Sequence, residues 1–369
     1  MDEISAQIKR ELENTVVDAL ASHRPILRHL NPDSSWLLQI PRPQTALTRS
    51  GRYYFNILID PWLSGPQSDV ASWFSQQWHA TESKVSSIAA AEDLLRHMEI
   101  LADRVKPKNA RKSNVDGMVD NDSATSLIDV VVVSHEFTDH CHKETLLEID
   151  KNVPVIATEK AAALIRSWSH FRQVLDTPPF GVKNLDWHTT SRTPLPDWVG
   201  ISRLVSPGDA LYYHSAILIA FNNGREDTDA AEAVIYTPHG TDHGTLNMVA
   251  TASPPIQTLA FLHGLHDISL GKAQQLNLGA HNGLRAQRVL NAKYWVGTHD
   301  EVKKGGGLVA WFLKRKVISV GEALEQELQS NKTRSENGDS HDHATNEVLQ
   351  SFKDTNWVEL ENGESKILY

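Results

Sequence analysis

One short segment of the sequence concentrates side chains that bind metal ions. After a run of valines at 131–133, residues 134–142 read Ser-His-Glu-Phe-Thr-Asp-His-Cys-His. A run of β-branched residues is typical of a buried strand, so this segment is expected to form the loop that follows it. Imidazole and carboxylate groups are ligands that zinc accepts readily. The spacing of His135, Asp139 and His140 therefore predicts a metal site.

Other candidate ligands also stand directly after predicted strands. His239, His263 and His299 each follow an apolar run, and Asp60 ends another. Side chains just beyond the carboxyl ends of strands are held by a rigid sheet and face a cleft. We expect such side chains from separate strands to converge on one site. The alternative for each histidine is a local hydrogen bond that caps its strand.

The elements that would position these residues alternate between short apolar runs and helical patterns. From residue 128 onward, this alternation favours sheets covered by helices over an all-α or all-β chain. The predicted strands are 35–40, 53–59, 128–133, 153–157, 216–221, 233–236, 258–262 and 294–296. The predicted helices are 159–171, 283–290, 308–314 and 322–328.

The chain is predicted to form one main domain with additions at both ends. Apolar residues recur every four positions near the N-terminus, which indicates a helix within 1–30. The main domain would span 31–330 and contain a helical insertion at about 64–128. Residues 331–346 are polar and predict a disordered loop. The last segment, 347–369, is expected to return to a sheet as a hairpin.

Composition and charge narrow the class of protein. Of the 369 residues, 40% are hydrophobic and 22% charged, as in ordinary globular proteins. The net charge of −10 gives no basic field that would recruit nucleic acid. A short basic cluster, Lys303, Lys304 and 314–316, is interpreted as a solvated helix face. The single cysteine, Cys141, excludes an intramolecular disulfide and fits a reducing compartment.

The same features give an expected location and partner. No apolar segment before Arg24 has the pattern of a signal peptide, and no stretch approaches the roughly 18 apolar residues that span a bilayer. We therefore expect a cytoplasmic protein without a membrane span or a nucleic-acid partner. Its substrate or ligand would be a small molecule.

The order of these residues resembles the metallo-β-lactamase fold superfamily. The landmarks of that superfamily are an Asp after an early strand, a His-x-His-x-Asp-His loop, two later ligands and a final His. The matching positions here are Asp60, the loop at 135–140, His214, His239 and His299. The resemblance implies an α/β chain folded as a four-layer αββα sandwich.

The resemblance covers roughly residues 35–315. It is greatest to the branch that contains ascorbate-6-phosphate lactonase and N-acyl phosphatidylethanolamine phospholipase D. It implies a metal-dependent hydrolase in which a metal-bound water attacks an ester, lactone, thioester, amide or phosphodiester bond. The rival interpretation is a non-catalytic, metal-poor protein of the same fold that binds a ligand.

Two positions depart from the superfamily pattern. Phe137 stands where the loop has its second His, and a phenyl ring cannot bind a cation. His239 stands where the superfamily has an Asp that bridges two metal ions. A carboxylate can give one oxygen to each of two ions, whereas one imidazole nitrogen binds a single ion. We therefore expect one metal ion, zinc, rather than two.

The resemblance also assigns expected roles to residues. The ligands of the single ion would be Asp139, His140 and His299, with His239 as a fourth. Asp60 would lie behind these ligands, on the side away from the metal ion, and hold them in place. The remaining members of the motif, His135 and His214, would hold a weaker second ion or stabilise the oxyanion, and Asp139 would also orient or deprotonate the attacking water.

Four further residues remain open as alternative ligands. His142 lies two positions beyond His140 and could compensate for Phe137. Asp242 and His243 offer another fourth ligand, and Cys141 offers a soft sulfur ligand. Each has an ordinary alternative as a turn, cap or core residue.

Overall fold

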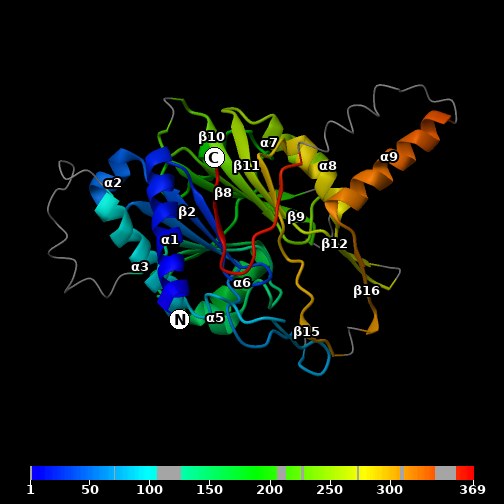
Figure 1. Ribbon diagram of the computed structural model, residues 1–369, viewed down its shortest axis with the longest axis horizontal. Coiled ribbons are helices and arrows are strands. Elements are labelled where there is room, and N and C mark those ends of the chain that lie inside the picture. Colours follow the sequence, from blue (N-terminus) through cyan, green and yellow to red (C-terminus); the bar gives the residue numbers. More distant parts are fainter. Residues whose placement is uncertain are drawn as a thin grey trace.

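The computed structural model describes residues 2–69, 71–105, 126–205, 213–225, 228–271, 274–307, 311–336 and 355–369. Two large sheets pack face to face, and helices cover the outer face of each (Figure 1). None of the described helices combines the length and the apolar character needed to cross a membrane.

The first large sheet has seven strands in the order β18-β1-β2-β3-β5-β6-β7. Its strands β3, β5, β6 and β7 are parallel, and the others are antiparallel to their neighbours. Their bounds are β1 (Ile26–His29), β2 (Trp36–Pro41), β3 (Tyr54–Ile59), β5 (Val130–Val133), β6 (Val155–Ala157), β7 (Val174–Asp176) and β18 (Ser365–Ile367).

The second large sheet has six strands in the order β17-β14-β11-β10-β9-β8. Strands β10, β11, β14 and β17 run parallel to one another. The bounds are β8 (Val199–Val205), β9 (Ser215–Phe221), β10 (Ala231–Thr237), β11 (Ile256–His263), β14 (Tyr294–Val296) and β17 (Trp357–Val358).

Alternate residues of each strand enter two different cores. In β5, Val130 and Val132 lie in the core between the two sheets, whereas Val131 and Val133 lie in the core beneath the helices. Both faces of the strand are therefore buried, which explains why the sequence shows a continuous apolar run instead of an alternating one.

The outer layers consist of helices at the two faces of the sandwich. Core residues of the first sheet pack against α3 (Ile88–Val105), α5 (Lys143–Leu147) and α6 (Glu159–Ser167), and α1 (Asp2–Ser22) packs on α3. The second sheet is covered by a group of three helices: α7 (Asn247–Ala250), α8 (Ala280–Leu290) and α9 (Val320–Glu336). The short α2 (Gln44–Ser50) buries no residue.

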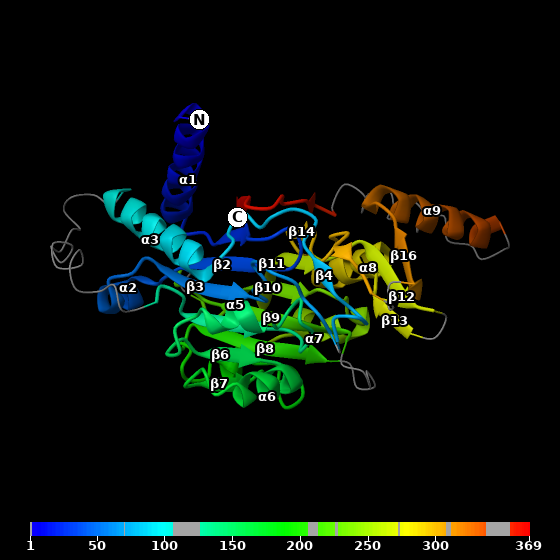
Figure 2. The same ribbon diagram turned by 90° about the horizontal axis from the view of Figure 1, so that it is seen from below.

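Two small sheets extend the sandwich, and the one with β12, β13 and β16 lies beside α9 (Figure 2). One has the order β13-β12-β16, and the other pairs β15 with β4. Their bounds are β4 (Gln77–Trp78), β12 (His266–Leu270), β13 (Gln274–Asn277), β15 (Lys304–Gly305) and β16 (Leu313–Val317). Two 3₁₀ helices, η3 (Trp187–Thr190) and η4 (His243–Leu246), complete the described elements.

Two predicted features near the C-terminus are wrong. The helix expected at 308–314 is instead an edge strand from Leu313 onward, because β16 pairs with β12; residues 308–310 lie outside the described part. Helix α9 runs through 331–336, which were expected as loop. The reciprocal Ser319–Glu322 capping box starts this helix, and polar composition alone does not end it. Residues 337–346 are outside the described residues.

The final segment returns to the sandwich, but not as a hairpin. Strand β17 pairs with β14 in the second sheet, and β18 pairs with β1 in the first. The two strands therefore join different sheets. The predicted start of the main domain at residue 31 would also cut β1 (Ile26–His29) off from the seven-stranded sheet to which it belongs.

Gly283 provides a test of packing between α8 and the second sheet. A Cβ atom at this position would lie 2.2 Å from Trp295 Cζ2. We expect Gly283→Ala to lower the free energy of unfolding by about 1–3 kcal/mol, because overpacking outweighs the better helix propensity of alanine. Urea unfolding measures the change.

Gly321→Ala in α9 is the matched control, since its Cβ would meet nothing closer than 3.8 Å. This variant is expected to be neutral or more stable, by up to about 1 kcal/mol. Equal effects of the two substitutions would contradict the tight contact at Trp295.

Candidate metal centre

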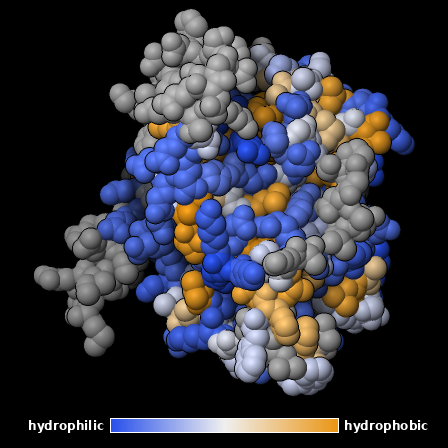
Figure 3. Space-filling model, turned by 90° about the vertical axis from the view of Figure 1, so that its right-hand side faces the viewer, coloured by the Kyte–Doolittle hydropathy of each residue, from blue (hydrophilic) through white to orange (hydrophobic). Residues whose placement is uncertain are grey.

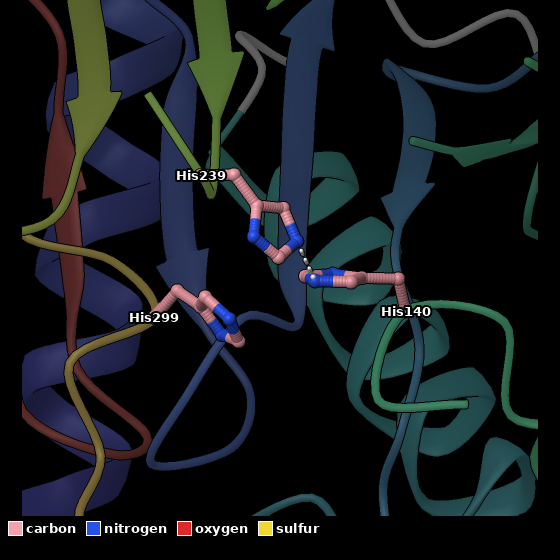
Figure 4. A group of neighbouring side chains, drawn as sticks. All are labelled: His140, His239 and His299. Atoms are coloured by element: carbon pink, nitrogen blue, oxygen red, sulfur yellow. Dashed lines mark hydrogen bonds between the residues drawn. The ribbon is translucent and has the colours of Figure 1, made fainter. Parts of the chain in front are cut away.

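Three imidazoles from three different strand ends point toward a common space (Figure 4). His140 follows β5, His239 follows β10 and His299 follows β14. Nε2 of His140 lies 3.0 Å from Nε2 of His239, and each of the three residues offers a ring nitrogen within 4.8 Å of the others. The residues are buried, with exposed fractions of 0%, 8% and 9%.

Each of these rings is held from behind through its other nitrogen. Nδ1 of His140 lies 2.8 Å from Asp60, and Nδ1 of His299 lies 3.0 Å from Asp33. Nδ1 of His239 lies 3.1 Å from the side-chain oxygen of Asn277. An acceptor at Nδ1 fixes the tautomer that leaves the Nε2 lone pair available for a metal ion.

Asp60 is fully buried and strongly anchored. Its backbone has a φ of +43°, and its carboxylate accepts hydrogen bonds from the Ser134 amide, the Ser134 hydroxyl and, at 2.7 Å, the Tyr236 hydroxyl. The carboxylate therefore has one fixed orientation toward His140. This contact places Asp60 behind an imidazole, and its role as a supporting residue of a metal site stays a prediction.

Lys303 forms a buried ion cluster beside the imidazoles. Its Nζ lies 2.7 Å from Asp139 Oδ2 and 2.9 Å from Asp33 Oδ2, and its side chain is 7% exposed. The interpretation of Lys303 as part of a solvated helix face is therefore wrong. No local pattern distinguishes it from its exposed neighbour Lys304, because its partners lie far away in the sequence.

The electrostatic balance keeps both members of the Lys303–Asp139 pair charged. Burial would raise the pKa of Asp139, but the charges of Lys303, His140 and His299 hold it well below its usual range. Burial would lower the pKa of Lys303, whereas the carboxylates of Asp139 and Asp33 raise it above its ordinary value.

The other two predicted catalytic histidines belong to neither group of described residues that could share an ion, although His135 is adjacent to the imidazole cluster. The His135 ring lies 4.7 Å from the His239 ring and 5.6 Å from the His140 ring, measured between centroids. It is buried, and its Nε2 has no hydrogen-bond partner among the described residues. His214 precedes β9 and belongs to neither group of described residues that could share an ion.

The alternative ligands lie elsewhere. His142 caps α5 by accepting from the Thr145 amide. Asp242 and His243 lie at the surface where η4 begins. His263 is engaged locally, 2.6 Å from the Gly264 carbonyl. Cys141 is buried in the outer core, and burial raises the pKa of its thiol.

A cavity of about 320 Å³ opens beside the imidazoles. Its polar lining includes Asp139, His239, His299 and Lys303 and also the charged residues Asp69, Glu301 and Arg315, and Phe137 forms part of the wall. The other apolar side chains of the lining come from the β4 region, the segment before β9 and the small three-stranded sheet: Phe74, Tyr213, Ile268, Leu270, Leu276 and Leu313. Hydrophobic and hydrophilic side chains are interspersed on this end of the molecule (Figure 3).

The residues present fit a divalent metal ion. Two nitrogens bound to one tetrahedral zinc ion lie ~3.3 Å apart, close to the separation of the His140 and His239 nitrogens. The carboxylates of Asp33, Asp60 and Asp139 are opposed by one ammonium. Two negative charges therefore remain when the imidazoles are in the neutral form that metal binding requires. A divalent cation would neutralise them.

Comparisons with known proteins support the fold. No protein-family model and no curated protein matches the sequence. The chain is similar to the crystal structure of a possible metal-dependent hydrolase from Veillonella parvula, at 13% identity and a TM-score of 0.51, covering 94% of this chain and 100% of that one.

Two further solved structures have lower TM-scores. They are an isothiocyanate hydrolase from Delia radicum gut bacteria (14% identity, TM-score 0.48, 93% and 99% covered) and the metallo-beta-lactamase fold protein YhfI from Bacillus subtilis (10%, 0.42, 93% and 99%). At these identities, similarity speaks to the fold alone. The predicted four-layer α/β sandwich is confirmed by the two facing sheets with helices on both outer faces. Its assignment to the metallo-β-lactamase type stays a prediction.

Proposed function

We propose that this protein is a metal-dependent hydrolase that holds one zinc ion on Nε2 of His140, His239 and His299. The observation that carries the proposal is the orientation of the three buried imidazoles. Each ring is fixed through Nδ1 by a separate acceptor, so that its other nitrogen faces the shared space. Three histidines with an open fourth position form a catalytic rather than a structural type of zinc site.

A zinc ion, when bound, supplies Lewis acidity and a water of lowered pKa. The protein supplies the surroundings of the reaction. Asp139 lies beside the imidazoles, with its oxygens 3.8 Å from His140 Nε2 and 3.9 Å from His299 Nε2. Because its pKa is low, the carboxylate is a weak base, and we assign it to orient the nucleophile by accepting a hydrogen bond.

Asp139 thus keeps the water-orienting role that the superfamily pattern implies, but we do not assign it as a metal ligand. Its Oδ2 is already bound by the Lys303 ammonium, which competes with a direct bond to metal. We therefore propose three imidazole ligands, with Asp139 next to them. His135 would line the same space with an imidazole that burial and the neighbouring His239 and His140 charges keep neutral, since its pKa lies well below the usual value.

The cavity indicates the kind of substrate. Its volume and its largely apolar walls suit a small molecule with an apolar body, whose scissile group would lie near Asp139. We propose an ester or lactone bond as the target, with thioesters, amides and phosphodiesters as further members of the test panel. The sequence resemblance to the lactonase supports the lactone, and the resemblance to the phospholipase D is the reason to keep phosphodiesters in the panel.

Metal analysis combined with hydrolysis assays tests the proposal. Protein purified without chelator is expected to contain about one zinc per chain and to hydrolyse at least one apolar ester or lactone. Chelation should remove the activity and added zinc should restore it. His239→Ala is expected to lose the zinc, because one of three ligands is missing.

His214→Ala is the matched control, since this histidine lies outside both candidate groups. It should keep one equivalent of zinc. Absence of zinc from the wild-type protein, even after reconstitution, would overturn the hydrolase proposal and favour the metal-poor ligand-binding protein. Equal loss of zinc from both variants would show that His214 is a ligand.

A further inference from the structure

Three described residues beside the imidazole cluster form a second arrangement of possible metal ligands. Asp33, Asp139 and His299 each offer a ligand atom within 4.8 Å of the others. The Lys303 ammonium lies within hydrogen-bonding distance of both carboxylates. The group therefore already contains a cation, supplied by the protein itself.

Independent evidence for a cation site comes from Asp33. Its side chain is 1% exposed, and its Oδ1 has no hydrogen-bond partner among the described residues. Oδ2 of the same carboxylate contacts both His299 and Lys303. Burying a carboxylate oxygen without a partner costs free energy, and this oxygen is available to bind a cation.

The lysine is held in place from several sides. Its Nζ lies 5.3 Å from the centre of the Trp62 ring, a favourable cation–π distance. Trp62 stacks on His79, whose Nδ1 lies 2.7 Å from Glu301 Oε2, two residues before Lys303. The next residue, Lys304, pairs with Trp78 in the β15–β4 ladder. The position of the ammonium is therefore set by the surrounding structure.

We propose that the Lys303 ammonium takes the place of a second divalent cation, and that the carboxylates of Asp33 and Asp139, beside His299, form a latent metal site which opens when the lysine is removed. This inference rests on the proposed function, which identifies the first ion as a zinc ion bound by the three imidazoles. The two carboxylates carry most of the latent site, because His299 also belongs to the three-imidazole cluster.

A lysine in this position would explain why the protein uses one metal ion instead of two. An ammonium gives a single positive charge and up to three hydrogen bonds, whereas a divalent ion would give twice the charge at the same carboxylates. Since the lysine is covalently attached, occupancy of this position does not depend on metal concentration. Lys303 would therefore act as a positioning residue that holds the Asp139 carboxylate through the 2.7 Å contact.

Manganese binding to Lys303→Ala tests the latent site. Mn²⁺ is the probe because it prefers carboxylate oxygen, and its free concentration can be measured by electron paramagnetic resonance. Zinc-loaded wild-type protein is expected to bind no Mn²⁺ tightly. Lys303→Ala should bind about one equivalent, at least 10-fold more tightly than wild type. Adding Asp139→Asn to this variant should remove the binding.

Lys304→Ala is the matched control, because this neighbouring lysine is exposed. It should behave like wild type. Lys303→Gln, which keeps a neutral donor, is the second variant in case the alanine variant is unstable. If either variant folds poorly, its thermal midpoint should rise with Mn²⁺ concentration.

Opposite results would overturn the inference. A folded Lys303 variant that binds no Mn²⁺ would show that the lysine does not replace a cation. The same conclusion would follow if an unstable variant gained nothing from Mn²⁺, or if wild type bound Mn²⁺ equally well. Zinc content, measured on the same samples, reports separately on the three-imidazole site and thus on the proposed function.

Discussion

Asp139→Asn is expected to lower kcat by about 100-fold or more while the protein keeps one equivalent of zinc. Loss of a group that positions the reacting atoms can lower a rate by about 100-fold. The carboxylate lies within 4 Å of two of the three proposed metal-binding nitrogens, and Lys303 fixes its orientation. Asparagine has nearly the same shape but loses the charge and one acceptor. The rate is measured on the best substrate of the panel, beside elemental analysis of the same sample.

Asp242→Asn serves as the control, since Asp242 was a candidate from the sequence but lies at the surface. It should change neither kcat nor zinc content. Loss of zinc from Asp139→Asn would show that Asp139 is a metal ligand, as the sequence pattern predicted. An unchanged kcat would contradict its role in orienting the nucleophile.

Much of the scaffold could be predicted because its signals are local. The buried strands of both large sheets, such as β5 and β9, are continuous apolar runs bounded by polar turns. A residue directly after such a strand lies at the edge of the sheet. The convergence of His140, His239 and His299 therefore follows from chain order and strand direction, before any side-chain geometry is known.

The residues that complete the centre could not be found in this way. Lys303 meets Asp139 across 164 positions of sequence, and Asn277 meets His239 across 38. Asp33 stands in a polar turn after β1 and has the appearance of an ordinary loop residue. Their partners are set by how the two sheets and the small sheet pack, so no spacing within a single element reveals them.

The small three-stranded sheet was missed for a related reason. Strands β12 and β13 have the sequences HDISL and QQLN, in which neither two-residue alternation nor a long apolar run is clear. Strand β16 carries three consecutive basic residues. These strands form through pairing with one another and contribute side chains such as Ile268 and Leu313 to the wall of the cavity.

The largest expected effect on stability concerns Arg24, which joins distant parts of the fold. Arg24 lies in the segment that joins α1 to β1, and its side chain is buried. Nε donates to the Leu368 carbonyl at 2.6 Å, and NH1 pairs with Glu232 at 2.6 Å. Glu232 belongs to β10, so this guanidinium links the N-terminal region, the C-terminal end and the second sheet.

Arg24→Met is expected to lower the free energy of unfolding by about 3 kcal/mol, measured by urea denaturation. Removing one partner of a buried ion pair typically costs about 3–5 kcal/mol, because the other charge remains without compensation. The lower end applies here, since Glu232 keeps a weaker partner in Arg225 at 3.7 Å and is partly accessible to solvent.

A double-mutant cycle with Glu232→Gln separates the ion pair from the hydrogen bond to Leu368. The Arg24→Met and Glu232→Gln variants should lose less stability together than the sum of their separate losses, because they share one interaction. Arg96→Met is the matched control, since its pair with Asp93 lies on the exposed surface of α3 and should contribute little. If Arg24→Met cost no more than this control, the buried guanidinium would not join these elements energetically.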